Sequence, residues 1–546
     1  MKSIITAFSF AIILLTVNSL LSQITQQWAV RYNFPGNEYQ TISTSVQVDP
    51  QGNVYITGYS SYEDSLLNSY YDWITIKYNS SGVQQWMQTY HYGIPNDMVV
   101  DNFGNVYVAG VGFDSLTNRP APITIKYNTS GVKQWERSYK ATDTTYGEIR
   151  SIKVDNLGNV YSAGYNGNID NYNFLAIKYN SSGVQQWASE YDGAGHNNDY
   201  VNDMAVDDSG NVYLTGKTIL GVLYSDYATV KFNNAGVQQW VQTHNGSLNR
   251  DDEATCIALD SSGNICVSGL TQEISNGGDY TTIKYNPSGV HQWTQRYNGP
   301  NNGGDRAECI AVDNLGNIYL SGRSRGTGTS DDFATLKYNS AGIQQWIMRY
   351  NGAASSNDGV VAMVLDDSNN VYVTGYTGSF ATFTDITSIK YSPTGVQKWM
   401  HIYNGPLNGQ DRPTDIAVDK TGGIYVTGYE TNKAGFDYSF VTIKYSWPVG
   451  IQNISSEFPD RFFLSQSYPN PFNPTTNINF TIPKSGFVKM IVYDINGREI
   501  STLVNQEMRP GSYKVDFDGS NLSSGIYYYT MTGGDFAETK KMMLVK

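Results

Sequence analysis

An aspartate that ends a short apolar segment recurs eight times through most of the chain. The positions are Asp49, Asp101, Asp155, Asp207, Asp260, Asp313, Asp366 and Asp419. The last four intervals are 53 residues each, and the earlier ones are 52 or 54 residues. A repeat of about fifty residues is one supersecondary unit that must stack on its neighbours to bury a core. This period constrains the fold more than any other feature of the sequence.

Each repeat has the pattern of four short strands joined by turns. In the sixth repeat the predicted strands span residues 310–313, 318–322, 333–338 and 343–350. Charged residues make up only 16% of the chain, whereas it has 53 glycines and 43 tyrosines, which suits short strands with tight turns. Four antiparallel strands per repeat form one blade of a β-propeller. The sequence therefore predicts an all-β fold whose main body is a propeller.

The phase of the repeat predicts how the ring closes. A tryptophan marks the fourth strand eight times, at Trp28, Trp86, Trp135, Trp187, Trp240, Trp293, Trp346 and Trp399. Trp28 precedes the first full repeat, whereas the last repeat ends at Tyr445 without a fourth strand. Pairing residues 26–33 with residues 415–446 would remove two open strand edges, which are otherwise aggregation sites. We therefore expect an eight-bladed β-propeller closed by the N-terminal strand.

The two ends of the chain differ from the repeats. Residues 1–22 combine Lys2 with an apolar run and read as a signal peptide, which leaves a propeller over residues 23–446. Residues 447–465 are predicted as a linker. Residues 466–546 are expected to form a small Ig-like β-sandwich, with strands at 476–482, 488–494, 512–517, 526–530 and 538–545. Cys256, Cys266 and Cys309 are too few for a disulfide framework and are expected to be free thiols.

The repeat resembles the SBBP family of β-propeller repeats and, more loosely, NHL repeats. The resemblance covers residues 26–446. Its pattern is seen at residues 206–216 (Val-Asp-x-x-Gly-Asn-Val-Tyr-x-x-Gly), 279–286 (Asp-Tyr-x-Thr-Ile-Lys-Tyr-Asn) and 236–240 (Gly-Val-Gln-Gln-Trp). The family occurs mostly in secreted bacterial proteins, so the resemblance supports the fold and implies little about a ligand.

The C-terminal segment resembles the type A sorting domain of the type IX secretion system. The matching motifs are residues 468–476, 493–499, 524–528 and 540–546. The resemblance implies contact with the type IX secretion machinery and passage across an outer membrane. It also implies removal of this domain or attachment at the cell surface, a secreted or outer-surface location, and a Bacteroidetes-like source.

Two sets of aspartates are candidates for a function. The eight repeated aspartates stand at a turn, where a carboxylate can accept hydrogen bonds from the turn's own N–H groups, so we interpret them as structural. A second set lies eight residues earlier, in the loop before the first strand: Asp199, Asp252, Asp305, Asp358 and Asp411. The first three repeats have Thr41, Gly93 and Gly147 there. These five carboxylates could ring the axis and bind Ca²⁺ or a cationic or sugar ligand, or each could cap its own loop.

These observations favour a non-catalytic binding protein with an unknown protein or glycan ligand. The net charge of −13 without a basic stripe argues against nucleic acid. The five histidines have no metal-ligand spacing, no nucleophile motif is present, and no membrane-spanning apolar stretch follows residue 22. Apart from possible Ca²⁺, no cofactor is predicted. Two alternatives remain open: a structural or adhesive envelope component, and a propeller lyase or hydrolase with an acidic axial site.

Overall fold

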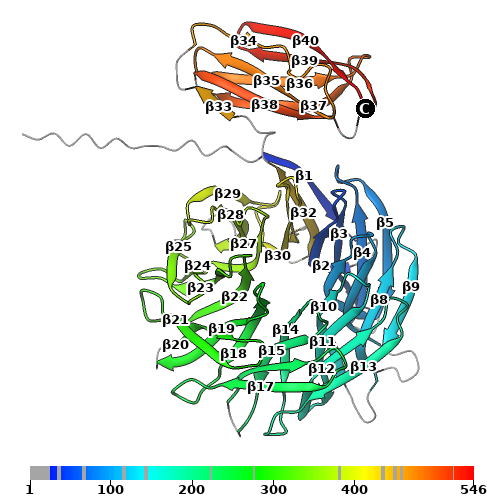
Figure 1. The fold of residues 1–546 in the computed structure, drawn as a ribbon, viewed down its shortest axis with the longest axis vertical. Helices are drawn as coiled ribbons and strands as arrows, with labels where there is room; N and C mark the ends of the chain where they lie inside the picture. Colours follow the sequence, from blue (N-terminus) through cyan, green and yellow to red (C-terminus); the bar gives the residue numbers. More distant parts are fainter. Residues whose placement is uncertain are drawn as a thin grey trace, which may run out of the picture.

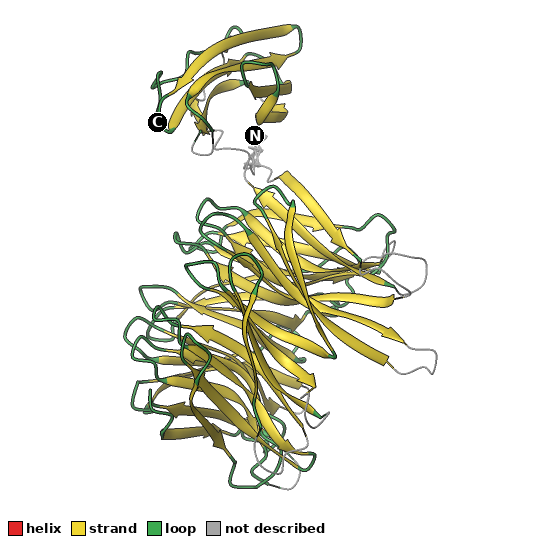
Figure 2. Cartoon of the chain, turned by 90° about the vertical axis from the view of Figure 1, so that its right-hand side faces the viewer, coloured by secondary structure: helices red, strands yellow, loops and turns green. Residues whose placement is uncertain are grey.

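The computed structural model describes residues 25–33, 38–63, 69–113, 119–140, 146–221, 224–274, 277–378, 383–431, 437–446, 452–455, 459–508, 510–519 and 522–546. Every regular element in these ranges is a β-strand (Figures 1 and 2). No helix in the described ranges has the length and apolar character needed to cross a membrane. The predicted signal peptide, residues 1–22, lies outside the described residues.

The repeats form successive antiparallel units of four strands, as the sequence predicts. The first unit contains β2 (Glu38–Val48), β3 (Val54–Glu63), β4 (Ser69–Tyr78) and β5 (Gln84–His91). The second contains β6 (Gly93–Val100), β7 (Val106–Phe113), β8 (Pro120–Tyr127) and β9 (Lys133–Ser138). The third contains β10 (Tyr146–Val154), β11 (Val160–Asn168), β12 (Asn171–Tyr179) and β13 (Gln185–Tyr191). The fourth contains β14 (Tyr200–Val206), β15 (Val212–Thr218), β16 (Asp226–Phe232) and β17 (Gln238–His244).

The later repeats follow the same plan. The fifth unit contains β18 (Glu253–Leu259), β19 (Ile265–Ile274), β20 (Gly277–Tyr285) and β21 (His291–Tyr297). The sixth contains β22 (Asp305–Val312), β23 (Ile318–Arg325), β24 (Asp331–Tyr338) and β25 (Gln344–Tyr350). The seventh contains β26 (Gly359–Leu365), β27 (Val371–Gly378), β28 (Thr384–Tyr391) and β29 (Gln397–Tyr403). The last repeat supplies β30 (Asp411–Val418), β31 (Ile424–Thr431) and β32 (Tyr438–Ser446).

The N-terminal strand β1 (Thr25–Tyr32) pairs antiparallel along β32, where the sequence predicted a missing fourth strand. One parallel bridge, between Gln40 and Tyr438, also connects β2 to β32. The first strands contact one another in order from β2 to β30, and β30 in turn contacts β2. Figure 1 shows these first strands toward the middle of the propeller, with the fourth strands along its outside.

Neighbouring units pack through apolar side chains from their facing sheets. One buried cluster, for example, joins Tyr319 and Phe333 of the sixth unit to Val360, Val371 and Ile389 of the seventh. Each first strand also carries a β-bulge at an equivalent position, such as the register shift between Ala307 and Cys309. A bulge bends the strand and redirects the extra residue. The innermost strands are thereby shaped in the same way in each repeat.

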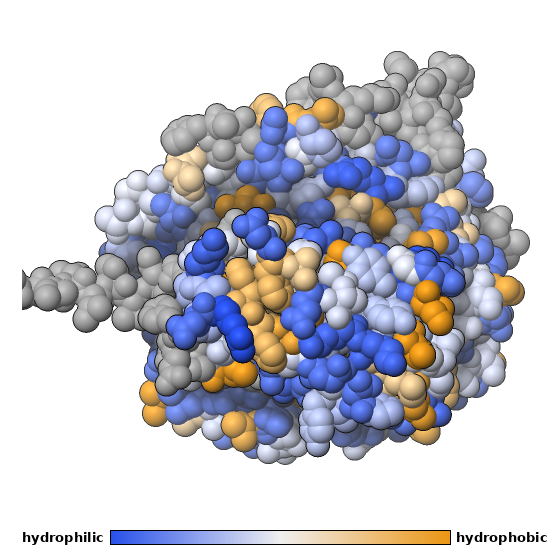
Figure 3. Space-filling view, turned by 90° about the horizontal axis from the view of Figure 1, so that it is seen from above, coloured by the Kyte–Doolittle hydropathy of each residue, from blue (hydrophilic) through white to orange (hydrophobic). Residues whose placement is uncertain are grey.

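The C-terminal domain consists of two four-stranded sheets around its own core. The first has the order β33 (Gln452–Ser455), β38 (Gly511–Asp518), β35 (Thr475–Ile482) and β34 (Phe463–Leu464). The second has the order β37 (Glu499–Met508), β36 (Gly486–Tyr493), β39 (Gly525–Gly533) and β40 (Phe536–Leu544). From above, hydrophilic and hydrophobic surface residues are interspersed (Figure 3).

Two expectations about this region need correction. The predicted linker, residues 447–465, contains two strands, because β33 pairs with the edge of β38 and β34 pairs with β35. An unpaired sheet edge offers free N–H and C=O groups to any nearby extended segment. Strand β37 was not predicted, because two register shifts against β36 interrupt the polar–apolar alternation.

Candidate functional site

The repeated aspartates are fully engaged in their own turns. In the sixth repeat, Asp313 Oδ1 accepts the N–H groups of Leu315 and Asn317, both at 2.9 Å, and Oδ2 accepts Asn317 Nδ2 at 2.8 Å and Tyr319 OH at 3.1 Å. Burial alone would raise the pKa of Asp313, but the bonds from Asn317 and Tyr319 outweigh it and lower the pKa. A bond from the N–H two residues ahead recurs at Asp49, Asp101, Asp155, Asp207, Asp260, Asp366 and Asp419.

The lysine of the third strand and the tryptophan of the fourth connect most repeats to the next. Lys337 Nζ and Trp346 Nε1 both donate to Pro393 O, at 3.1 and 3.0 Å. In the same way, Lys444 Nζ and Trp28 Nε1 both donate to Ser80 O, at 3.1 and 3.2 Å. Residues that recur in nearly every repeat are thus occupied in building and joining the repeats.

The fifth repeat contains an informative exception. The tyrosine that elsewhere donates to the repeated aspartate is replaced by the buried Cys266. Lys284 Nζ instead approaches Asp260 Oδ2 directly, at 2.9 Å. The aspartate keeps a side-chain donor, which supports its structural role.

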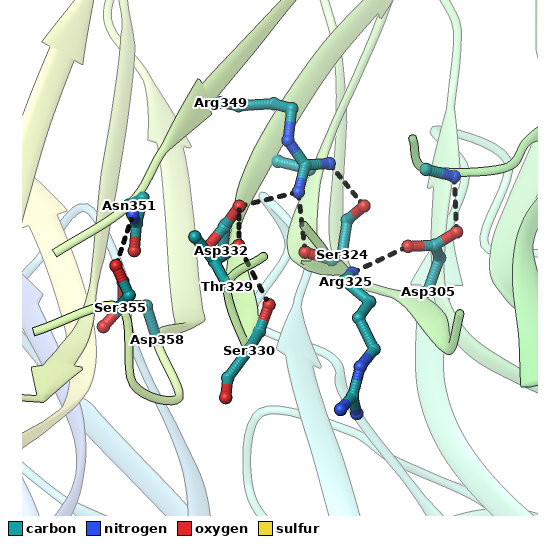
Figure 4. Close-up of polar contacts among 12 residues, drawn as sticks. Asp305, Ser324, Arg325, Thr329, Ser330, Asp332, Arg349, Asn351, Ser355 and Asp358 are labelled. Carbon is teal, nitrogen blue, oxygen red and sulfur yellow. Dashed lines mark hydrogen bonds and ion pairs between the residues drawn. The ribbon is translucent and has the colours of Figure 1, made fainter. Parts of the chain in front are cut away.

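The five loop aspartates also turn into their own loops. Asp305 is 1% exposed; its Oδ2 accepts Gly299 N–H at 2.6 Å and its Oδ1 accepts Arg325 N–H at 3.0 Å (Figure 4). The N–H six residues earlier is donated likewise to Asp199, Asp252, Asp358 and Asp411. Burial raises the pKa of Asp358 and Asp411 to about 6. This geometry is that of a loop cap.

The structure does not gather the loop aspartates into one cluster. Among the described residues, no group of three or more His, Cys, Asp or Glu side chains is arranged to hold a metal ion. Beside Asp305, the polar contacts serve the protein itself: Arg349 donates to Ser324 Oγ at 2.5 Å and to Asp332 Oδ2 at 2.9 Å (Figure 4).

The first three repeats lack the loop aspartate, and a pocket lies there. Its volume of about 560 Å³ lies within the usual range of roughly 300–1,000 Å³ for ligand pockets. Five aromatic side chains line it: Tyr70, Tyr71, Tyr92, Phe113 and Tyr146. We call this the aromatic groove.

The aromatic groove has a volume of about 560 Å³, and its rim is well exposed: Tyr71 is 38%, Phe113 42% and Tyr92 48% accessible. Two of the lining tyrosines, Tyr70 and Tyr92, contact each other edge to face at a ring-centroid distance of 5.5 Å. Contiguous exposed apolar surface of this kind commonly marks a binding site.

Sequence reasoning missed this groove. Tyr92 and Tyr146 directly precede Gly93 and Gly147, which replace the loop aspartate in the second and third repeats. The available signal was the coincidence of missing aspartates with tyrosines that do not recur in other repeats.

A charged cluster occupies the inner strands of later repeats. Arg306 lies 3.3 Å from both Glu253 and Glu308, Lys217 lies 3.7 Å from Glu253, and Arg323 lies 3.8 Å from Glu308. Burial raises the pKa of Glu308, although Arg306 and Arg323 oppose the shift. The two carboxylates therefore lie beside three cationic side chains, with Arg306 shared between them.

On the first strand of the third repeat, β10, Lys153 is surrounded by acidic side chains from the first strands of other repeats. Burial would lower its pKa, but Asp97, Asp203 and Asp415 outweigh this effect and raise it. The carboxylates also link neighbouring repeats, since Asp97 Oδ2 accepts Ile152 N–H at 2.9 Å. Asp415 Oδ2 makes the equivalent bond with Val46 N–H at 2.9 Å, from the last repeat to the first. These groups hold the inner strands together.

Sequence profiles of two families match the chain. The secretion system C-terminal sorting domain matches residues 466–546, and the SBBP β-propeller repeat matches residues 27–62, 187–219 and 400–436. The sorting domain points to export and implies interaction with the type IX secretion machinery. No curated protein matches the chain.

Several solved structures are similar in fold. The Dos1 propeller has 9% identity and a TM-score of 0.45, with 78% of this chain and 95% of that chain covered. The polysaccharide lyase Uly1 has 11% identity and a TM-score of 0.41, with 77% and 99% covered. The similarity is limited to the arrangement of strands.

Proposed function

Because the chain carries SBBP β-propeller repeats and a C-terminal sorting domain, we propose that it is a secreted or outer-surface propeller that binds a ligand without transforming it. The sorting domain supplies the route of export, and the propeller supplies the binding surface. The ligand-binding site is the aromatic groove.

In this proposal the repeats form a closed ring of eight blades, and β1 is the fourth strand of the last blade. Support comes from the bonds of Trp28 and Lys444 to Ser80, which repeat the contacts that Trp346 and Lys337 make with Pro393. The bond from Val46 N–H to Asp415 supports the same closure. The C-terminal domain is an Ig-like sandwich with its own core.

The aromatic groove is the observation that carries the binding function. The repeated aspartates, lysines and tryptophans are engaged in turns and joints, whereas Tyr71 and Tyr92 present exposed aromatic surface in a pocket. Tyrosine supplies a large contact area with little loss of side-chain entropy, so it suits a binding surface.

The test is binding of the mature chain, residues 23–546, to arrays of glycans and peptides. We expect one ligand class to bind, with binding lost in Tyr92→Ala and kept in Tyr224→Ala, a control tyrosine that is 42% exposed outside the groove. Attachment that survives Tyr92→Ala would favour a structural or adhesive envelope role. Mass spectrometry of the bound ligand should show no product.

One observation favours a catalytic alternative. Acid–base catalysis by a lyase or hydrolase needs a carboxyl group with a raised pKa near a second carboxylate, and Glu308 and Glu253 share Arg306. Product formation by the wild type that is abolished in Glu308→Gln, with binding retained, would establish this alternative.

A further inference from the structure

We infer that the aromatic groove binds an uncharged saccharide, whose ring faces stack on the tyrosines and whose hydroxyl groups meet the tyrosine hydroxyls. This inference rests on the proposed function and specifies its ligand class.

The lining of the groove disfavours charged ligands. None of the described side chains that line it carries a charge. A carboxylate, sulfate or ammonium group placed there would lose hydration without gaining an ionic partner. The net charge of −13 further opposes an acidic polymer.

Two main-chain carbonyl groups at the groove are already paired, which disfavours a peptide that would use them. Tyr92 O accepts Phe113 N–H at 3.2 Å, and Val111 O accepts Trp73 Nε1 at 3.0 Å. Recognition of an extended peptide relies on main-chain hydrogen bonds or on a polar donor beside aromatic ridges. Here the indole donor of Trp73 is occupied.

The groups that remain match a sugar. The side chains of Tyr71 and Tyr92 make no hydrogen bond within the described residues that would occupy their hydroxyls. A phenol hydroxyl both donates and accepts, as a sugar hydroxyl does. The aromatic faces provide the apolar surface on which the C–H face of a sugar ring can pack.

The backbone of Tyr92 is fixed in an uncommon conformation by a hydrogen bond to Asp72. Its φ of 64° is in the left-handed region, which is uncommon for a bulky residue. Asp72 stabilises this conformation: its Oδ1 accepts Tyr92 N–H at 3.1 Å, while its Oδ2 lies 2.9 Å from His91 Nδ1. A backbone segment fixed before binding loses less entropy when the ligand arrives.

The test measures binding of the mature chain to immobilised neutral oligosaccharides, acidic oligosaccharides and proline-rich peptides. We expect neutral oligosaccharides to bind. Tyr92→Ala should weaken binding about tenfold or more. Tyr92→Phe keeps the stacking face and loses the hydroxyl, so it should weaken binding less, and Tyr224→Ala should leave it unchanged. Circular dichroism verifies folding, and Tyr71→Ala provides a second groove variant should Tyr92→Ala not fold.

The possible outcomes separate the two proposals. Binding of peptides or acidic glycans that depends on Tyr92 would overturn the saccharide assignment and leave the binding function intact. Neutral-saccharide binding that is unchanged in both Tyr92→Ala and Tyr71→Ala would overturn the groove as the site. Absence of any ligand that depends on these tyrosines would overturn both proposals.

Discussion

Arg31 in β1 and Glu430 in β31 form an ion pair between residues 399 positions apart in the sequence. The Glu430 side chain is only 3% exposed, and Tyr403 OH donates to its Oε2 at 2.6 Å. Arg31 Nη2 lies 2.6 Å from the same hydroxyl. The first strand is therefore attached to the last repeat by a side-chain network as well as by its ladder of main-chain bonds.

Arg31→Ala should destabilise the propeller by about 3 kcal/mol, because it leaves Glu430 buried without its cation. Urea unfolding followed by tryptophan fluorescence measures the change. Lys133→Ala removes one partner of a more exposed pair with Glu136 and should change stability by about 0.5 kcal/mol or less. Equal effects of the two variants would contradict the importance assigned to the joint.

Asp207→Ala should destabilise the fourth repeat by roughly 2–4 kcal/mol, since it removes the acceptor for Ser209, Asn211 and Tyr213. The matched control is Asp208→Ala, because Asp208 is the next residue in the chain and is exposed. Differential scanning calorimetry should show a lower unfolding temperature for the first variant alone. Equal unfolding temperatures for Asp207→Ala and Asp208→Ala would disprove the role of Asp207 in building the turn.

Stability should fall as the pH rises from about 4 to 6. Burial raises the pKa of Asp358, Asp411 and Asp415 to about 6, above the usual unfolded value of about 3.9. In this window the folded state keeps protons that the unfolded chain has released, so raising the pH favours unfolding.

The pH effect is measured by denaturant unfolding at pH 4.5 and 6.5. Asp358→Asn should reduce the difference between the free energies of unfolding at the two pH values by roughly 1–3 kcal/mol. This holds even if the variant also changes the stability equally at both pH values. Asp208→Asn should retain the wild-type difference. A wild-type profile in Asp358→Asn would show that this buried carboxyl group does not titrate as proposed.

Ca²⁺ should leave the unfolding temperature unchanged. The loop aspartates already accept N–H groups, as Asp305 does from Gly299 and Arg325, so their oxygens are directed into the loops. Calorimetric titration of chelator-treated protein measures binding. Saturable stabilisation that disappears in the double variant Asp305→Asn, Asp358→Asn would instead establish the axial Ca²⁺ site.

The repeats explain why much of the fold could be predicted from the sequence. The same turn around Asp313, and the same lysine and tryptophan positions, are sampled in each repeat, so local irregularities do not hide the pattern. The unmatched Trp28 similarly predicted the pairing of β1 with β32. Buried positions that recur at a fixed spacing are the easiest to predict from a sequence.

The aromatic groove could not be predicted in the same way. Tyr92 and Tyr146 share one position of the repeat, directly before the missing loop aspartate, whereas Tyr71 lies in the third strand of the first repeat, so no single spacing relates all three. The left-handed backbone of Tyr92 is likewise set by the contact with Asp72, 20 residues earlier. Such a site depends on distances in the folded chain, which a periodic pattern does not encode.

The pairing of β1 with β32 also sets an order of events in folding. The first strand of the propeller to be synthesised receives its partner only after the last repeat has been made, so its ladder is a late contact. Joining segments this far apart carries the largest loop-closure entropy, and non-local pairing slows folding. The repeats that lie between β1 and β32 in the sequence can pack on their neighbours beforehand, which shortens the effective length of chain that this pairing must close. Pairing of β1 with β32 is thus a late folding step that requires the last repeat to be present.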